Sequence, residues 1–294
     1  MTRREWQRLR WGVFFISPWI IGFLAFTLYP IVASFVFSFT DFNAINFSPS
    51  WVGLDNYTSL LTDDNRFWVS LQNTLTYAGI LIPVATIFNV FTAVLLNLDV
   101  RGRSVYRTIF FLPVLVPSVA AAMTWVWILN PDRGLINGLL SYVGIPGPLW
   151  LASPSTALLS LVLIAIWGGG QAIVIYLAGL QDIPRHLYEA AEIDGANAWN
   201  RAIHVTVPLL TPQVLFNVIT LLIFSFQAFA EPFIMTGGGP ADSTLLYALN
   251  LYQRAFQDLK MGYASAMAWI LFLLILTLTL LVFRMAQRWV VYER

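Results

Sequence analysis

The chain has 294 residues, of which 58% are hydrophobic and only 11% are charged, and its mean hydropathy is +0.71. Soluble domains carry about 25% charged residues, so this chain has too few charges to cover a globule in water. The net charge of +1 argues against a polyanion-binding surface, and the lack of cysteine excludes disulfide bonds and thiolate chemistry. The excess of apolar residues therefore predicts a membrane protein.

The first apolar run follows a basic head and extends over residues 11–39. It is much longer than the ~7–15-residue apolar region of a signal peptide, and no A-x-A-like cleavage site closes it. We therefore expect a retained first helix. Pro18 and Pro30 are expected to kink this helix rather than end it, because neighbouring helices can satisfy the freed backbone groups.

Six apolar stretches are long enough to span a bilayer, which takes about 20 residues. They cover residues 11–39, 67–96, 108–129, 156–180, 208–231 and 263–283. With the N-terminus inside, the cytoplasmic side carries twelve arginines, and the opposite side carries three arginines and Lys260. Because basic residues concentrate in cytoplasmic loops, both termini are predicted to be cytoplasmic. The fold class predicted is all-α, with a single transmembrane domain over residues 1–294.

The six apolar cores contain no Asp, Glu, Lys, Arg or His; Glu231 lies only at the outer rim of the fifth. Ion-coupled carriers usually place ionisable residues at membrane depth, and a membrane enzyme needs a base near its nucleophile. The chain also lacks the G-x-x-x-x-G-K-[ST] phosphate loop. These absences predict a protein that neither hydrolyses nucleotide nor catalyses a reaction.

The third cytoplasmic connection, residues 181–207, has the signals of a short helix. Asp182 is a suitable cap, Pro184 suits the first turn, and Gly195 favours the left-handed residue that ends a helix. A second short helix is predicted from about Ala198 to Val205. Leu187, Ala190 and Ala191 share one face of the first helix, and small alanines permit close approach of another protein. These residues alone leave two alternatives open: a docking site for a partner, or a loop that covers its own bundle.

Motifs spread over nearly the whole chain resemble one transporter family. The loop contains Glu189-Ala190-Ala191, Asp194-Gly195-Ala196 and Val207-Pro208-Leu209-Leu210-x-Pro212, which resemble the EAA loop of binding-protein-dependent ABC importer permeases. Further matches to the sugar-permease branch are Tyr29-Pro30, Gly53-Leu54-Asp55-Asn56-Tyr57, Arg107-Thr108-Ile109-Phe110-Phe111-Leu112-Pro113, Thr236-Gly237-Gly238-Gly239-Pro240, and Ser243-Thr244 followed by Tyr252 and Ala255-Phe256. The set resembles the first permease of the maltose-type group.

This resemblance implies the type I permease fold of ABC importers, in the inner membrane. It implies a coupling helix from Glu189 to Gly195 that is seated in a cleft of a cytoplasmic ATPase, with contacts from Ala190, Ala191 and Asp194. The implied partners are a second permease in a heterodimer, an ATPase dimer, an extracytoplasmic solute-binding protein and the lipid bilayer, with no nucleic acid. No cofactor is expected in this chain, since ATP and Mg would be bound by the ATPase. Ala202 departs from the family, which commonly has an aromatic residue there.

Two features mark a candidate path for the substrate. If the fifth stretch is one straight helix, five polar side chains point within about 40° of one direction around its axis and form a stripe. Ser225 lies off this stripe. The stripe consists of Gln213, Asn217, Thr220, Gln227 and Glu231. Such groups either face a watery cavity, where amides and hydroxyls suit sugars, or bond neighbouring helices together.

The second feature lies in the fourth stretch, where Trp167-Gly168-Gly169-Gly170-Gln171 weakens the helix near its middle. A broken helix at this depth is typical of transporter binding sites, although glycines also allow tight helix packing. The predicted path residues are Trp167, Gly168, Gln171, Asn217, Thr220 and Gln227.

The function predicted is a transmembrane subunit of an ATP-driven importer for a carbohydrate. The alternatives are the same architecture for glycerol phosphate or a polyol, and a standalone secondary carrier or channel.

Overall fold

The computed structural model describes residues 2–45 and 49–291 of the chain. It divides into two compact units, one formed by residues 1–64 and 251–272 and the other by residues 65–250 and 273–294. Within the described residues every regular element is a helix, and one isolated antiparallel bridge joins Thr40 to Trp51. The predicted all-α class is confirmed. A single domain over the whole chain stays a prediction, and the two units are described separately below.

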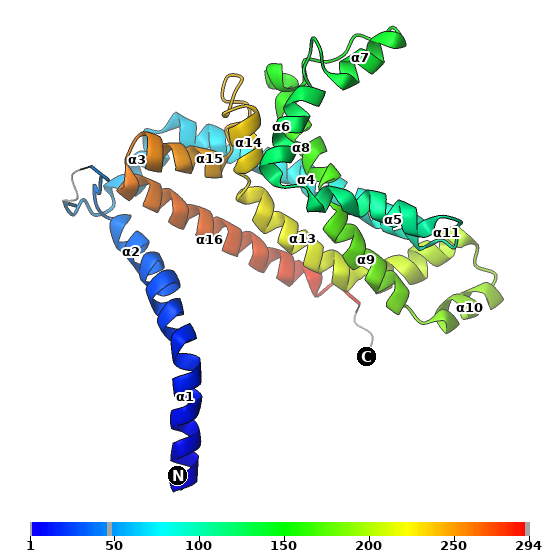
Figure 1. Cartoon of the computed structure of the whole chain (residues 1–294), viewed down its shortest axis with the longest axis horizontal. Helices are drawn as coiled ribbons and strands as arrows, with labels where there is room; N and C mark the ends of the chain where they lie inside the picture. The colour runs from blue at the N-terminus through cyan, green and yellow to red at the C-terminus, as the bar shows by residue number, and fades with distance from the viewer. Residues whose placement is uncertain (1, 46–48, 292–294) are drawn as a thin grey trace. The chain divides into compact units, whose positions relative to one another are not determined.

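In the first unit, α1 (Arg3–Phe23) continues through a π-helical turn (Leu24–Leu28) into α2 (Tyr29–Phe37) (Figure 1). Pro18 lies inside α1, and Pro30 follows directly after the π-helical turn. A proline clashes with the carbonyl four residues before it, which here is that of Phe26, and a π-helical turn relieves this crowding without ending the helix. The prolines thus leave one helical stretch of 35 residues, as the sequence predicts, and none of its 18-residue apolar window is buried.

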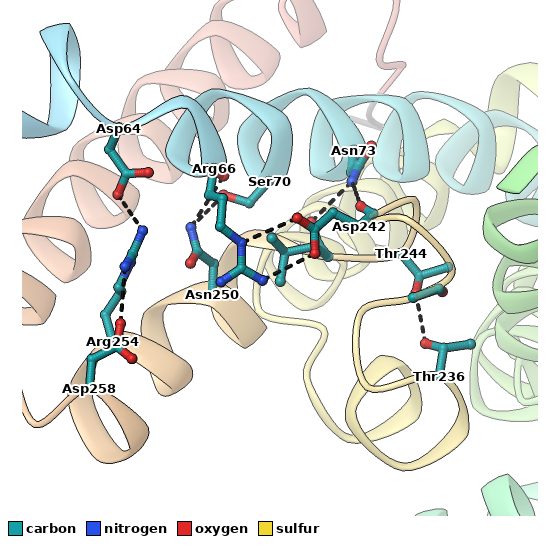
Figure 2. A network of polar contacts seen from close by, with 12 residues as sticks. Asp64, Arg66, Ser70, Asn73, Thr236, Asp242, Thr244, Asn250, Arg254 and Asp258 are labelled. Atoms are coloured by element: carbon teal, nitrogen blue, oxygen red, sulfur yellow. Dashed lines mark hydrogen bonds and ion pairs between the residues drawn. The ribbon is translucent and has the colours of Figure 1, made fainter.

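The rest of the first unit is held to α2 by polar and aromatic contacts. The first half of α16 (Met261–Ala286) packs there, with Trp269 Nε1 donating to Ser34 Oγ at 3.3 Å. Asn56 of α3 (Asp55–Thr62) donates to the carbonyl of Thr40 at 2.9 Å. Arg254 lies between Asp64 and Asp258, at 2.8 and 3.0 Å from their carboxylate oxygens (Figure 2).

The second unit is built around α4 (Asn65–Asn97), which packs against α8 (Pro154–Trp167), α9 (Gly170–Asp182) and α13 (Thr211–Phe226) (Figure 1). Two apolar clusters hold these helices together. One includes Leu81, Ala122 and Leu161; the other includes Ala93, Tyr176 and Leu210. The remaining elements of this unit include α7 (Leu135–Tyr142) and the first four residues of α15 (Tyr247–Tyr252). The rest of α15 and the π-helical turn Gln253–Gln257 belong to the first unit.

Two of the predicted spans are bent pairs of helices. The stretch predicted as 108–129 consists of α5 (Arg103–Phe111), a 3₁₀ turn (Leu112–Leu115) and α6 (Ser118–Ile128), with a bend of 103°. Pro113 and Pro117 fall at this bend, where each removes a backbone donor. The other pair, α8 and α9, is bent by 46° at Gly168-Gly169.

Four helices of the described chain are long and apolar enough to cross a membrane, and the count reaches six if each bent pair is one span. The long helices agree in place with the first, second, fifth and sixth predicted stretches. The fifth extends further than expected, over residues 211–235, with breaks described below. Six crossings remain a prediction.

Gly170 is where α9 meets α5 at close range. A Cβ there would lie 2.5 Å from the backbone oxygen of Phe110 and 2.9 Å from Val114 Cγ2. Because a backbone oxygen cannot rotate away, Gly170→Ala is expected to destabilise the protein by about 1–3 kcal/mol. Gly79→Ala is the matched control, since a Cβ at Gly79 in α4 meets nothing within 4 Å and alanine favours the helix. Thermal unfolding in detergent, followed by size-exclusion chromatography, measures both. Equal midpoints for the two variants would contradict the contact.

Candidate functional site: a cavity and a loop of short helices

A cavity of about 670 Å³ lies within the second unit. Its walls come from α4, the 3₁₀ turn after α5, α6, α8, α13 and α14 (Ala230–Met235). Most of the lining side chains are apolar, including the aromatic rings of Trp167, Phe224 and Phe229, and the polar ones are Tyr77, Ser118, Ser225, Gln227 and Glu231. A largely apolar, partly open cavity of this size with a few polar groups has the character of a small-molecule site.

Three of the six predicted path residues line this cavity. Trp167 and Gly168 reach it from the bend between α8 and α9, and Gln227 reaches it from the end of α13. Trp167 stands edge-on to Trp125 of α6, with ring centroids 5.5 Å apart. That contact fixes the indole at the wall. Trp125 itself packs against the apolar cluster that includes Leu81, Ala122 and Leu161.

The other three predicted residues are not among the lining side chains. Asn217 Nδ2 donates to the carbonyl of Gln213 at 2.9 Å, and Thr220 Oγ1 donates to that of Phe216 at 2.9 Å. Both bonds lie within α13, so these polar groups are satisfied by their own helix. Gln171 is an exposed residue in the first turn of α9.

The prediction of a polar stripe assumed one straight helix through residue 231, but the structure breaks this helix. α13 ends at Phe226 and α14 begins at Ala230, so the helical phase is lost across residues 227–229. Ser225 lies off the stripe yet lines the cavity, as does Ser118. Ser118 directly follows Pro117, which lies at the bend before α6. In the sequence, this proline was the feature that could have indicated a residue at a cavity wall.

Asn89 is a further buried polar residue that was not predicted from the sequence. It is 4% exposed in the C-terminal third of α4, and its Oδ1 has no hydrogen-bond partner in the described part of the chain. A Cβ at Gly169 would lie 2.7 Å from this oxygen, so the amide stands beside the α8–α9 bend. Its isolation in the run Ile87-Phe88-Asn89-Val90-Phe91 was the signal that could have found it.

The loop after α9 contains the predicted first short helix, α10 (Arg185–Ile193). Pro184 is its N-cap, whereas Asp182, expected as a cap, is the last residue of α9. At the other end Gly195 has φ +78°, and Ala196 N–H donates to the carbonyl of Ala191 at 2.9 Å. This is the glycine-ended Schellman geometry that the sequence predicts.

The second short helix follows directly. Asn197 caps α11 (Ala198–Arg201) by accepting from Asn200 N–H at 2.8 Å. A π-helical turn (Ala202–Thr206) and α12 (Val207–Leu209) then lead into α13. An ion pair between Glu192 and Arg201 links α10 to α11, so the two helices form one structured element.

One side of α10 packs on the bundle and the other is exposed. Leu187 and Tyr188 contact the cluster around Leu180 and Leu210, and the Tyr188 hydroxyl lies 3.0 Å from Thr206 Oγ1. The helical spacing predicts that Leu187 shares one face with Ala190 and Ala191, but Leu187 packs inward whereas Ala190 is exposed. Of the predicted coupling residues, Ala191 is half-buried, and the others are exposed: Glu189, Ala190, Asp194 and Gly195.

Two large apolar side chains beside these residues are exposed to an unusual degree. Ile193, the last residue of α10, is 87% exposed, and Trp199 in α11 is 71% exposed. Figure 1 shows α10 standing beyond the end of α9, away from the helices packed around α4. Neither residue could be assigned to the docking face from the sequence, because the exposure of a single apolar side chain depends on the tertiary structure.

The segment after α14 is tied to α4 by an ion pair and hydrogen bonds (Figure 2). Arg66 pairs with Asp242 at 3.1 Å, and Asn73 Nδ2 donates to the Asp242 carbonyl at 2.7 Å. Within the segment, the hydroxyls of Thr236 and Thr244 lie 2.7 Å apart. The Thr236–Pro240 motif is thus part of a hydrogen-bonded segment that is held to α4.

Comparison with known proteins places the chain in one family. Residues 82–291 match the family model described as the inner membrane component of binding-protein-dependent transport systems. The probable ABC transporter permease YesP of Bacillus subtilis is 44% identical over 286 residues, which cover 96% of this chain and 92% of YesP. The trehalose/maltose transport system permease MalF of Thermococcus litoralis is 32% identical over 291 residues, covering 97% of each chain.

A solved structure has the same fold. A chain in the crystal structure of a bacterial ABC transporter involved in the import of alginate has a TM-score of 0.85 and 23% identity, with 97% of this chain and 99% of that chain covered. At that identity the likeness concerns the fold alone. Together with the family model and the close relatives, it leads to one conclusion: this chain belongs to the family of inner membrane components of binding-protein-dependent transport systems.

Proposed function

We propose that this chain is a transmembrane subunit of an ATP-driven ABC importer and that its cargo is a carbohydrate. The observation that carries the proposal is the pairing of a 670 Å³ cavity within the bundle with an exposed loop of short helices at the end of α9. The cavity offers a place for a solute, and the loop offers a place for a partner that supplies energy. Both occur in a chain of the transport family described above.

The chemistry of the cavity supports a sugar as cargo. Trp167 presents a flat apolar ring, and Gln227 presents an amide that both donates and accepts hydrogen bonds. Sugar rings have apolar faces and a rim of hydroxyls, so they match such a wall. Relatives named for trehalose/maltose, starch degradation products and arabinooligosaccharides favour the same class. A polyol or glycerol phosphate in the same architecture is the second candidate.

The proposed energy source is a separate ATPase dimer that binds ATP and Mg. Contacts from Glu189, Ala190 and Asp194 would seat α10 in the ATPase, while the Glu192–Arg201 pair keeps α10 and α11 together. Closure of the ATPase on ATP would then move the loop, and with it α9 and α13, which the loop connects. This arrangement assigns no catalytic step to the chain itself.

The remaining partners follow from the same proposal. A second permease would complete the translocation path as a heterodimer, and an extracytoplasmic binding protein would deliver the cargo. The chain would lie in the inner membrane with both termini in the cytoplasm, as the distribution of arginines favours. The exposed apolar surface of α1 would then face lipid or the second permease.

Co-purification tests the proposed assembly. The tagged chain, expressed with its genomic neighbours and extracted in mild detergent, is expected to retain a protein with a G-x-x-x-x-G-K-[ST] phosphate loop and Mg-dependent ATPase activity. Mass spectrometry identifies the protein, and phosphate release measures the activity. Purification of a stable, solute-binding chain that retains no such subunit would favour the standalone carrier instead.

Trp167→Ala tests the cavity. Loss of the stacking wall is expected to raise the apparent KM for uptake about tenfold, which corresponds to about 1.4 kcal/mol. Trp127→Ala is the matched control, because Trp127 is an exposed tryptophan of α6 that does not line the cavity. Uptake of radiolabelled sugar by the full assembly measures both. Equal KM values in the two variants would remove Trp167 from the path.

Gln171→Ala and Asn217→Ala are expected to leave both the apparent KM and the rate within about twofold of the wild type. The reason is their position, since neither side chain lines the cavity and the Asn217 amide bonds within α13. The same uptake assay measures them. A tenfold change in either variant would restore that residue to the substrate path.

A further inference from the structure

Glu231 gives the cavity a formal charge. It is the second residue of α14, it is half-buried, and it lines the cavity together with Gln227. Among the described residues that line the cavity, it is the only Asp, Glu, Lys, Arg or His. No Arg, Lys or His of the described chain forms an ion pair with it.

The surroundings of Glu231 let its charge act over a distance. The walls near it come mainly from aliphatic and aromatic side chains such as Leu221, Phe224 and Phe229, which screen charge poorly. The carboxylate also lies within electrostatic range of the buried Tyr77. Part of the side chain remains exposed, so water in the cavity can solvate the carboxylate.

The size of the effect follows from Coulomb's law. At an effective dielectric constant of about 20 and a separation of about 5 Å, two like charges disfavour each other more than a hundredfold, and screening by cavity water reduces this to about tenfold. An anionic solute would meet this repulsion during passage, whereas an uncharged one would not. A cationic solute would be attracted to the same degree.

We propose that Glu231 sets the charge selectivity of the cavity, which admits uncharged and cationic glycans and rejects glycans that carry carboxylate, sulfonate or phosphate groups. This inference rests on the proposed function, because it concerns solutes that pass through the same cavity. It also argues against glycerol phosphate as the cargo, since that solute belongs to the rejected class, whereas an uncharged polyol belongs to the admitted one.

A local structural role for Glu231 has to be distinguished from this one. An acidic residue in the first turn of a helix stabilises the helix N-terminus modestly, and Glu231 lies in the first turn of α14. Glu231→Gln would remove that stabilisation as well as the charge in the cavity. The test therefore has to report the electrostatic field in the cavity and not the stability of α14.

The sequence contains no cysteine, so a single introduced thiol is a clean probe of that field. Ala228→Cys places it on the cavity wall three residues before Glu231, and Ser118→Cys places it on the wall contributed by α6. Ser141→Cys, on an exposed position of α7 outside the cavity, is the reference. Each thiol is reacted in native membranes of the full assembly with methanethiosulfonates that carry a trimethylammonium, a sulfonate or an uncharged hydroxyethyl group.

The rate of the cationic reagent divided by that of the anionic one, normalised to the same ratio at Ser141→Cys, measures the selectivity. With Glu231 present the normalised ratio at Ala228→Cys is expected to be about ten or more, and Glu231→Gln brings it close to one. Glu231→Asp keeps most of the bias, because it keeps the charge. A ratio that is the same with glutamate and glutamine overturns the proposal.

Absence of any reaction with the uncharged reagent at both cavity thiols also overturns it, since solutes would then not enter. Failure of the proposed function is a separate outcome. It would appear as a chain without an ATPase partner, whatever the ratios at Ala228→Cys.

Discussion

Replacement of Ile193 by aspartate is expected to abolish ATP-dependent uptake and the retention of the ATPase during purification. Ile193 is 87% exposed at the end of α10, so it contributes little to the packing of this chain. If it fills a cleft on the ATPase, its burial there stabilises the complex by about 1.5–3 kcal/mol. A carboxylate in the same cleft adds a desolvation cost, so the affinity is expected to fall at least about a hundredfold.

Val143→Asp is the matched control for this change. Val143 is also a large apolar residue, 69% exposed, and it follows α7 rather than belonging to the loop after α9. We expect this variant to retain the ATPase as the wild type does. Affinity purification with quantified ATPase and an uptake assay measure both variants. Equal retention in Ile193→Asp and Val143→Asp would mean that the exposed end of α10 is not the docking face.

Gly195→Val is expected to abolish retention of the ATPase during purification and to reduce uptake to background, while the amount of protein in the membrane stays unchanged. Gly195 has φ +78°, a conformation that β-branched residues avoid at a cost of about 1–2 kcal/mol or more. A Cβ there would meet nothing within 4 Å, so the penalty comes from the backbone and not from a clash. The chain would relieve it by changing the turn after α10, which would displace Ile193 and the Ala190 face.

Two controls separate this local effect from general damage. Asparagine adopts the left-handed conformation more readily, so Gly195→Asn is expected to keep a substantial part of the uptake. Gly144 has φ +73° and also has open space around it, but it lies after α7. Gly144→Val therefore introduces the same strain elsewhere and should leave ATPase retention intact. Equal loss of retention in Gly144→Val and Gly195→Val would show that the effect is not specific to the loop.

The loop could be predicted closely because its signals are local. Pro184 and Gly195 determine where α10 begins and ends, and each acts through its own backbone conformation. The places of the long helices followed equally well from the length of the apolar runs. These features need no knowledge of which residues meet in space.

The cavity could be predicted only in part, because it depends on helix breaks and on packing. Trp167 and Gly168 were found, since three consecutive glycines mark the α8–α9 bend in the sequence itself. Ser225 was missed because the face of α13 that lines the cavity is marked by Leu221 and Phe224, and the polar stripe does not mark that face. Leu187 was assigned to the outward face because only its neighbours in space, such as Leu210, show that it packs inward.

Reconstitution in proteoliposomes tests the central claim, that this chain moves a solute only as part of an ATP-driven assembly. Vesicles would contain the chain with its second permease and the ATPase, with the binding protein and radiolabelled sugar outside and ATP inside. The account predicts saturable uptake that requires ATP and every one of these components, and none with the chain alone. Saturable uptake by the chain alone, without ATP, would contradict it.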